Sequence, residues 1–227
     1  MKTILKVVVG SRLHGLNKPD SDYDYRGVFM HPVEDILSPF KKIKNTSWIE
    51  GDVDNTAYEL REFCKMATQG NPSVTEILYS NIVEEIDDIG KELVANRQKF
   101  LSSIRIFEAY KGYAHNQYNK MNLFEPDERT PKFAVAYIRS LWQGIGLLKT
   151  GEITNQVSEP LRSFLLEVKH DFKASLIPEL GRKFSTLQVE IAEAYYTNQN
   201  KFQPDLAWIE DFVSRAYLQK ELSTIRT

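Results

Sequence analysis

The fold is decided by Gly10-Ser11-Arg12-Leu13-His14-Gly15 and, a few residues later, by Ser21-Asp22-Tyr23-Asp24. A mostly apolar run, residues 4–9, precedes the first stretch and is typical of a buried strand. The run stops at Gly10, and glycine best allows a tight turn or the close approach of a ligand to the backbone. We therefore expect a strand, a turn with a short helical segment, and a second strand over residues 23–30.

Two carboxylates, Asp22 and Asp24, stand two positions apart near the start of the second predicted strand. Positions i and i+2 of a strand point to the same face, and two neighbouring carboxylates repel each other unless a cation lies between them. Mg²⁺ or Mn²⁺ takes such oxygen ligands, and Mg²⁺ commonly shares them with substrate phosphates. The pair therefore predicts a divalent metal site, and two metal ions are a known arrangement for in-line displacement at phosphorus. Without the preceding Gly-Ser turn, a solvated strand edge or an Asx turn would be the better interpretation.

The turn at Gly10 and Ser11 is the second part of this predicted site. Its backbone N–H groups and the Ser11 hydroxyl could bind a phosphate, and Arg12 could pair with the same phosphate. Ser11 could instead cap the short helical segment, and one residue can do both. His14 is open to two interpretations, a structural hydrogen-bonding group or a catalytic one.

The order Gly-Ser, spacer, Ser-Asp-x-Asp resembles the signature of the DNA polymerase beta-like nucleotidyltransferase superfamily. The longer string GSRLHGLNKPDSDYDYRGVFMHP, residues 10–32, is similar to one branch of it, the RNA-ligase-associated predicted nucleotidyltransferases of bacteria and phages. The resemblance implies a metal-dependent enzyme that moves a nucleoside monophosphate from an NTP to a hydroxyl acceptor and releases pyrophosphate.

The resemblance also implies a third carboxylate on a neighbouring strand, which completes the metal site. Such a group can accept the proton of the attacking hydroxyl. In the family pattern an acid stands six residues before a leucine that opens a helix, and Asp54 stands six residues before Leu60. Asp52 is a rival in the same predicted hairpin, whose strands are 46–49 and 53–58. The expected catalytic and metal-binding set is Asp22, Asp24 and Asp54.

Other stretches that resemble the family supply further polar candidates. Asn71 and Glu76 follow a predicted helix over 58–69, and they could line the nucleotide pocket or serve as a helix cap and a surface acid. In the second half of the chain, the matched residues that could contact the triphosphate or the acceptor are Gln117, Lys120, Lys132, Arg139 and Lys169. Ala136 stands where the family pattern K-x-x-x-H-x-x-R has its histidine, and this departure argues against a catalytic role for that helix.

The periodicity after residue 102 is helical throughout. Before it, further helices are expected at 72–79 and 86–101. After it, the predicted helices are 104–122, 132–150, 161–172, 186–197 and 206–222, which together indicate a bundle. The expected fold class is therefore α+β, a polymerase beta-like nucleotidyltransferase core with a small mixed or antiparallel sheet over residues 1–102. A helical-bundle domain over residues 103–227 would close the cleft.

Composition limits the location and the partners. Cys64 is the only cysteine of the 227 residues, and neither a signal peptide nor a membrane-spanning stretch is evident, so we expect a cytoplasmic protein. A net charge of −2 gives no support to tight non-specific binding of nucleic acid.

The expected partners are an NTP, an RNA or tRNA end at a local site, and an RNA ligase of the same pathway. Two alternatives stay open at this point. One is adenylylation of a protein or a small molecule, and the other is a nucleotide- or RNA-binding module that has lost catalysis.

Overall fold

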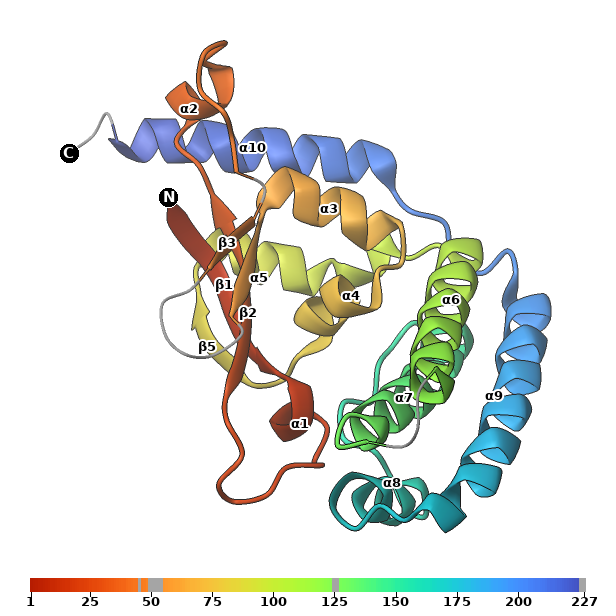
Figure 1. Cartoon of the computed structure of the whole chain (residues 1–227). Helices are drawn as coiled ribbons and strands as arrows, with labels where there is room; N and C mark the ends of the chain where they lie inside the picture. The colour runs from red at the N-terminus through yellow and green to blue at the C-terminus, as the bar shows by residue number, and fades with distance from the viewer. Residues whose placement is uncertain (45, 49–54, 124–126, 225–227) are drawn as a thin grey trace.

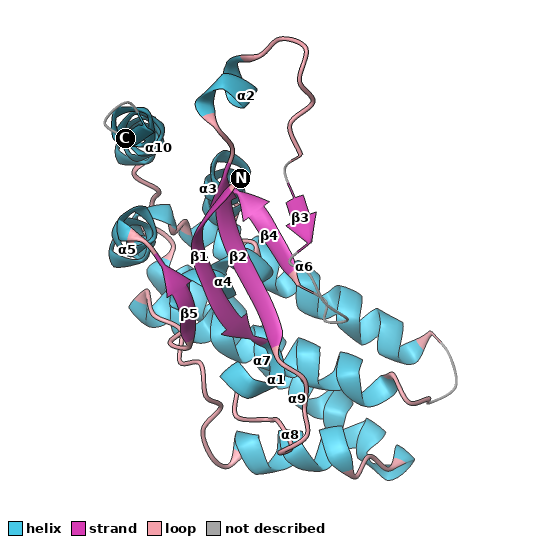
Figure 2. Ribbon diagram, turned by 90° about the vertical axis from the view of Figure 1, so that its left-hand side faces the viewer, coloured by secondary structure: helices cyan, strands magenta, loops and turns pink. Residues whose placement is uncertain are grey.

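A mixed sheet lies at the centre of the first half of the protein. The computed structural model describes residues 1–44, 46–48, 55–123 and 127–224. In these ranges the sheet has the strand order β3-β4-β2-β1-β5 (Figure 2). Its strands are β1 (Lys2–Val9), β2 (Asp24–Met30), β3 (Thr46–Trp48), β4 (Thr56–Glu59) and β5 (Val83–Ile86). β2 and β4 run parallel and the other neighbours run antiparallel, which confirms the predicted small mixed sheet.

β1 runs through the sheet with β2 on one side and β5 on the other. Most of its side chains are buried, namely Ile4, Leu5, Val7, Val8 and Val9, because helices pack against the sheet. Helix α5 (Asp88–Ala95) approaches so closely that a Cβ atom on Gly90 would lie 2.1 Å from the Ile4 carbonyl oxygen. The apolar run that the sequence shows at 4–9 is therefore the central strand of the core.

Short helices connect and cover the strands: α1 (Gly10–Leu13), α2 (Val33–Leu37), α3 (Leu60–Thr68), α4 (Pro72–Tyr79), α5 (Asp88–Ala95) and the 3-10 helix η1 (Arg97–Phe100). The prediction of one continuous helix over residues 86–101 is wrong. Ile86 ends β5, Asp87 caps α5 by accepting a hydrogen bond from the Gly90 N–H at 2.9 Å, and η1 follows. β5 was not expected, because its Val-Glu-Glu-Ile sequence shows no alternating pattern.

Longer helices make up the second half: α6 (Ser103–Asn122), α7 (Thr130–Thr150), α8 (Leu161–His170), the 3-10 helix η2 (Ala174–Leu176), α9 (Ile177–Asn198) and α10 (Leu206–Thr224). α7 packs against α6, α8 and α9, which confirms the predicted helical packing there (Figure 1). α6 and α7 lie close together at Gly144, where a Cβ atom would come within 2.9 Å of the Tyr110 Cβ. In the described part of the chain, no helix combines the length and hydrophobicity that a bilayer span requires.

The placement of residues 206–222 in the bundle is wrong, because α10 returns to the first half of the molecule (Figure 1). The Arg215 guanidinium donates to the Glu92 carboxylate of α5, at 2.8 and 3.2 Å. The Trp208 ring packs edge-on against Phe100 of η1. The division of the chain into two domains at residue 102 stays a prediction.

The contact between α10 and α3 includes a buried carboxylate. Glu59 is 1% exposed, and its side chain accepts hydrogen bonds from the Arg61 and Glu62 N–H groups and from the Tyr217 hydroxyl. We expect Tyr217→Phe to lower the free energy of unfolding by about 2 kcal/mol, because a buried charged acceptor loses a donor. Urea denaturation measures this, with Tyr196→Phe on a 67% exposed side chain as the control. Equal effects of the two changes would contradict this role of Glu59.

Candidate active site

A cavity of about 550 Å³ opens where β1, α1 and β2 face α4 and α7. It is lined by predicted residues from both halves of the chain. These residues are Gly10, Ser11, Asp24, Glu76, Lys132, Arg139 and Lys169. His14 and Arg26 also line it. Residues far apart in the sequence thus meet in the cavity that the Gly-Ser turn borders.

The contact between Gly10 and Asp24 forms one wall of the cavity. The antiparallel register pairs Val9 with Asp24, so the turn after β1 begins beside the carboxylate. Gly10 has φ +69°, and a Cβ atom on it would lie 2.2 Å from the Asp24 Oδ2. Only glycine accepts this backbone conformation and this close approach together.

Arg12 does not line the cavity. Its guanidinium donates to the backbone carbonyl groups of Pro19 at 3.3 Å, of Ser21 at 3.1 Å and of Asp22 at 3.3 Å. It also lies 3.9 Å from the centroid of the Tyr23 ring. Arg12 therefore fixes the loop before β2, a structural task that differs from the predicted contact with phosphate.

Asp22 is exposed and lies outside the cavity lining. The strand begins only at Asp24, so the geometry of two carboxylates on one strand face does not apply. Asp52 and Asp54 lie outside the described residues. Within the described ranges, no three His, Cys, Asp or Glu side chains gather as a metal site. The Asp24 carboxylate supplies the hard oxygen donors that Mg²⁺ or Mn²⁺ requires, so the chemistry of this wall fits such an ion.

One face of α7 forms the opposite wall. Lys132, Ala136 and Arg139 follow one another at intervals of four and three residues, which places them on the same side of a helix. Ala136 lines the cavity at the position where the family pattern has histidine. At this point the cavity is therefore lined by the methyl group of Ala136, where the family pattern would place an imidazole ring.

Three of the predicted nucleotide contacts do not line this cavity. The Asn71 side chain accepts a hydrogen bond from the Ser73 N–H at 3.0 Å and caps α4. Of the two roles that the sequence left open for Asn71, the structure thus shows the helix cap. Lys120 borders a separate cavity of about 260 Å³ beside Asp127 and Arg129. Gln117 is absent from the lining of the active-site cavity as well.

A buried polar cluster joins the Gly-Ser turn to both walls. The Arg139 Nη1 donates to Glu76 Oε1 at 2.9 Å and to Gln143 Oε1 at 3.0 Å, and it lies 2.6 Å from His14 Nε2. Glu76 Oε1 also contacts His14 Nε2. His14 is 2% exposed, and its Nδ1 lies 3.0 Å from the Asn155 carbonyl oxygen. Because a carbonyl oxygen only accepts, His14 Nδ1 carries the proton of this hydrogen bond.

The charges of this cluster set its protonation. Burial lowers the pKa of His14, and the neighbouring Arg139 lowers it further, while Glu76 opposes the shift. Burial alone would raise the pKa of Glu76, but Arg139 and His14 outweigh burial and lower the pKa to about 2. At neutral pH Glu76 is therefore a carboxylate that lies beside the Arg139 guanidinium.

Lys169 of α8 is a second cation held at the cavity. Its Nζ donates to the Leu16 carbonyl oxygen at 3.0 Å. Burial lowers the pKa of Lys169, and the Asp24 carboxylate counteracts part of that effect. With Arg26, Lys132 and Arg139, the cavity carries four basic residues next to the acidic Asp24, Glu76 and Glu128. Basic side chains that share a cavity with the Asp24 carboxylate suit a polyanionic ligand that brings a metal ion with it.

Tyr113 and Glu128 are among the lining residues that were not expected from the sequence. Tyr113 stands three residues after the buried Tyr110 on α6, so helical spacing indicates a core-facing position. No local pattern shows that this face of α6 reaches the cavity. Glu128 lies in a loop, and no sequence pattern around it indicates a position at the cavity.

The fold and the site define a polymerase beta-like protein. It has a small mixed sheet, a Gly-Ser turn held against the first aspartate of the next strand, and a helical wall with basic side chains. The model of one family, RlaP, described as the RNA repair pathway DNA polymerase beta family, matches residues 1–211. The chain belongs to this family, a polymerase beta-like nucleotidyltransferase family of an RNA repair pathway.

A phage protein is similar to part of the chain. It is an uncharacterized 38.9 kDa protein from the nrdC-mobD intergenic region of Enterobacteria phage T4, and it is 30% identical over 132 residues. The match covers 53% of this chain and 39% of the phage protein. The chain thus matches well under half the length of that relative.

The Gly10 contact yields a stability prediction. Gly10→Ala should lower the free energy of unfolding by at least about 1–2 kcal/mol, because alanine resists the left-handed conformation and its methyl group would displace the Asp24 carboxylate. Gly112→Ala is the matched control: it lies within α6, nothing meets a Cβ atom there, and it should raise stability by up to about 1 kcal/mol. Urea denaturation of both variants measures these changes in the free energy of unfolding. A Gly10→Ala protein as stable as the natural chain would disprove the close contact.

The lowered pKa of Glu76 predicts a dependence of stability on pH. The folded pKa of about 2 lies below the ordinary value of 4.5, so the stabilisation is present above pH 4.5 and is lost as the pH falls toward 2. This loss amounts to roughly 3 kcal/mol at most. The lowered pKa of His14 also makes the free energy of unfolding fall as the pH drops just below 6.5.

Glu76→Gln removes this titration. The variant should be less stable at neutral pH, because the partly buried Arg139 loses its carboxylate, and its stability should change less between pH 4.5 and 2. Denaturation curves at a series of pH values measure both effects. Glu193→Gln, on an exposed part of α9, is the control and should follow the natural chain. Parallel pH profiles for all three proteins would contradict the charged state of Glu76.

Proposed function

We propose that this protein is a metal-dependent nucleotidyltransferase that moves a nucleoside monophosphate from an NTP to a hydroxyl group of an RNA end and releases pyrophosphate. The observation that supports it most is the Asp24 carboxylate against Gly10, at a cavity whose opposite wall is basic. A carboxylate that can bind metal and cationic groups that can bind phosphate are two requirements of phosphoryl transfer.

The triphosphate would lie between Ser11 and the basic side chains of α7 and α8. The Ser11 hydroxyl can donate to a phosphate oxygen, and Lys132 and Lys169 can neutralise the charge of the β- and γ-phosphates. Arg139 is already engaged by Glu76 and His14, so it presents a guanidinium whose direction is fixed. Such fixed charges cost little reorganisation during the reaction.

The carboxylates would hold Mg²⁺ or Mn²⁺, with Asp24 in the cavity and Asp22 and Asp54 as further ligands. When bound, the ions supply charge neutralisation and a more acidic acceptor hydroxyl. For Asp54 the support is the sequence pattern alone, with Asp52 as its rival.

An RNA end is the acceptor that the family favours, because the family belongs to an RNA repair pathway. The net charge of −2 favours a short end over a long duplex, because phosphate contacts supply most non-specific affinity. An RNA ligase that joins the repaired end would be a partner in the same pathway, and a cytoplasmic location would suit this role. Transfer to a protein or a small molecule is the alternative that the assay below distinguishes.

The Asp24 carboxylate provides the central test. Asp24→Asn should reduce transfer by about 10³-fold or more, because metal neutralisation contributes several kcal/mol to the transition state. Its thermal stability should change little. Asp20→Asn, an exposed aspartate of the same loop, is the matched control and should stay active. An Asp24→Asn protein with natural activity would disprove the metal role of this residue.

The assay combines the protein, Mg²⁺, each α-labelled NTP in turn and a pool of small RNAs, and it resolves RNA and protein on one gel. We expect the label on RNA, and its dependence on the NTP identifies the base. Label on protein would instead establish protein adenylylation. If the protein neither transfers label nor binds any NTP with Mg²⁺, the proposal is wrong.

A further inference from the structure

A loop between α2 and β3 projects beyond the end of the sheet that lies away from the active site (Figure 1, Figure 2). We call residues 37–44, Leu-Ser-Pro-Phe-Lys-Lys-Ile-Lys, the basic loop. Three of its eight residues are lysines and none is acidic, in a chain whose net charge is −2. None of the residues assigned to nucleotidyl transfer above belongs to this local concentration of positive charge.

The aromatic ring of the basic loop is exposed to solvent. Phe40 is 95% exposed, more than any other large hydrophobic side chain in the described part of the chain, and Leu37 is 75% exposed. Because burial of apolar surface is what stabilises a fold, Phe40 adds almost nothing to the stability of this one. Its ring is available to a ligand instead.

Local contacts close the basic loop onto α2. Lys41 forms an ion pair with Asp35 of that helix. The buried His31, which precedes α2, places its Nε2 at 3.0 Å from the carbonyl oxygen of Lys44 at the end of the loop. The exposure of Phe40 is therefore a feature of a loop that is held at its base.

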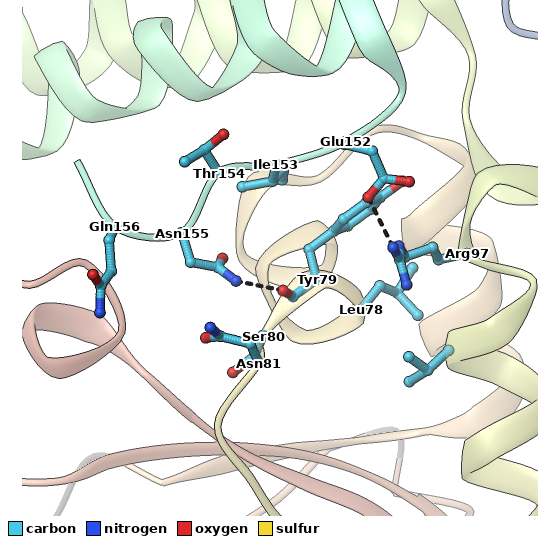
Figure 3. Close-up of a pocket in the computed structure, with 11 residues that line it drawn as sticks. Leu78, Tyr79, Ser80, Asn81, Arg97, Glu152, Ile153, Thr154, Asn155 and Gln156 are labelled. Carbon is cyan, nitrogen blue, oxygen red and sulfur yellow. Dashed lines mark hydrogen bonds and ion pairs between the residues drawn. The ribbon is translucent and has the colours of Figure 1, made fainter. Parts of the chain in front are cut away.

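Elsewhere in the protein, basic side chains lie against aromatic rings. Arg97, for example, lies 4.9 Å from the centroid of the Tyr79 ring and pairs with Glu152 at 2.8 Å (Figure 3). No cation and no second ring from the described residues lies against Phe40, although lysines follow it directly in the sequence. The ring and the lysines of the basic loop can thus contact one ligand together.

Two of the three lysines carry charge that the described residues do not neutralise. Lys42 and Lys44 are exposed, and neither has an acidic partner within the described ranges. Glu34 of α2 is also exposed but lies outside the basic loop. Positive charge beside an exposed aromatic ring suits a ligand in which flat rings alternate with anionic groups. Single-stranded nucleic acid has this chemistry, and proteins bind it with basic grooves and aromatic side chains on which its bases stack.

A protein partner fits the basic loop less well. A stable protein interface takes about 800 Å² from each partner, whereas one aromatic side chain contributes at most about 250 Å². Two exposed apolar side chains, Leu37 and Phe40, fall well short of that area. A single base stacked on one ring requires no more surface than Phe40 offers.

We propose that the basic loop binds a single-stranded part of the RNA acceptor, with a base stacked on Phe40 and phosphates paired with Lys42 and Lys44. This role rests on the proposed function, which makes an RNA end the acceptor. The seven residues of β2 separate Asp24 from the loop by about 20 Å, at ~3.3 Å per residue. A stacked strand that reaches from the active site to the loop therefore has at least about six nucleotides, at ~3.4 Å each.

Fluorescence anisotropy of the full chain, without NTP, tests the proposal with a labelled, unstructured RNA of about twelve nucleotides, twice that span. Phe40→Ala should weaken binding by about tenfold, because it removes one stacked base. Phe40→Leu should weaken it similarly, whereas Phe40→Trp should retain it, because the interaction requires a ring. Tyr196→Ala removes a 67% exposed aromatic side chain elsewhere and should bind as the natural chain does.

The lysines are tested by the dependence of binding on salt. Lys42→Gln and Lys44→Gln should each reduce the slope of log K against log salt by roughly 0.7, the value for one phosphate contact on a single strand. Lys149→Gln, on an exposed lysine of α7, is the matched control and should leave the slope unchanged. An RNA duplex of the same length should not respond to Phe40→Ala, because its bases are already stacked.

The outcomes separate this proposal from the proposed function. Equal RNA binding by Phe40→Ala and the natural chain would overturn the role of the loop alone, and Mg²⁺-dependent binding of NTP should be the same in both proteins. Equal binding by Phe40→Leu and the natural chain would overturn it as well, by showing apolar contact in place of stacking. If Phe40→Ala loses binding to phosphatidylserine vesicles and keeps binding to RNA, the loop contacts a membrane and the proposal is wrong. A natural chain that binds no single-stranded RNA would overturn both the role of the loop and the RNA acceptor.

Discussion

The close approach of the Asp24 carboxylate to the Gly10 backbone is the constraint on which the arrangement of the site depends. It follows from the antiparallel pairing of β1 and β2, which aligns Val9 with Asp24. Because a strand register is fixed by burial of one face, a shift by one residue would turn the carboxylate away from the turn and expose the core. The strand pairing that buries the side chains of β1 therefore also determines the position of the Asp24 carboxylate.

The cluster of His14, Glu76 and Arg139 extends this constraint to the helices. It joins residues that lie 62 and 125 positions apart in the sequence. Taking these groups out of water is costly, and a buried ion pair rarely repays that cost fully as stability. The cluster instead fixes the orientation of the Arg139 side chain. His14 and Glu76 hold its guanidinium on two sides, so it can face the cavity in only one way. A reaction that needs charges already in place gains from such rigidity.

Much of the fold was predictable, because local signals agree with the final packing. The apolar run at 4–9, the Gly-Ser turn and the Asn-Pro start of α4 each determine their elements directly. α10 was placed wrongly because the apolar face with Trp208 and Phe212 suits a bundle as well as a helix that packs on η1 and α3. Helical periodicity shows that a face is buried and does not show which partner buries it.

The site shows the same limit at the level of single residues. The motif placed Gly10, Ser11 and Asp24 in one site, and they meet because the antiparallel pairing of β1 and β2 brings Asp24 to the turn. It did not separate Arg12, which binds its own loop, from arginines that reach the cavity. Polar side chains near a turn find backbone carbonyl groups before they find a ligand. A basic residue within a nucleotide-binding motif therefore counts as a ligand contact only after its local hydrogen bonds are known, and in this protein that criterion favours Lys132 of α7 over Arg12.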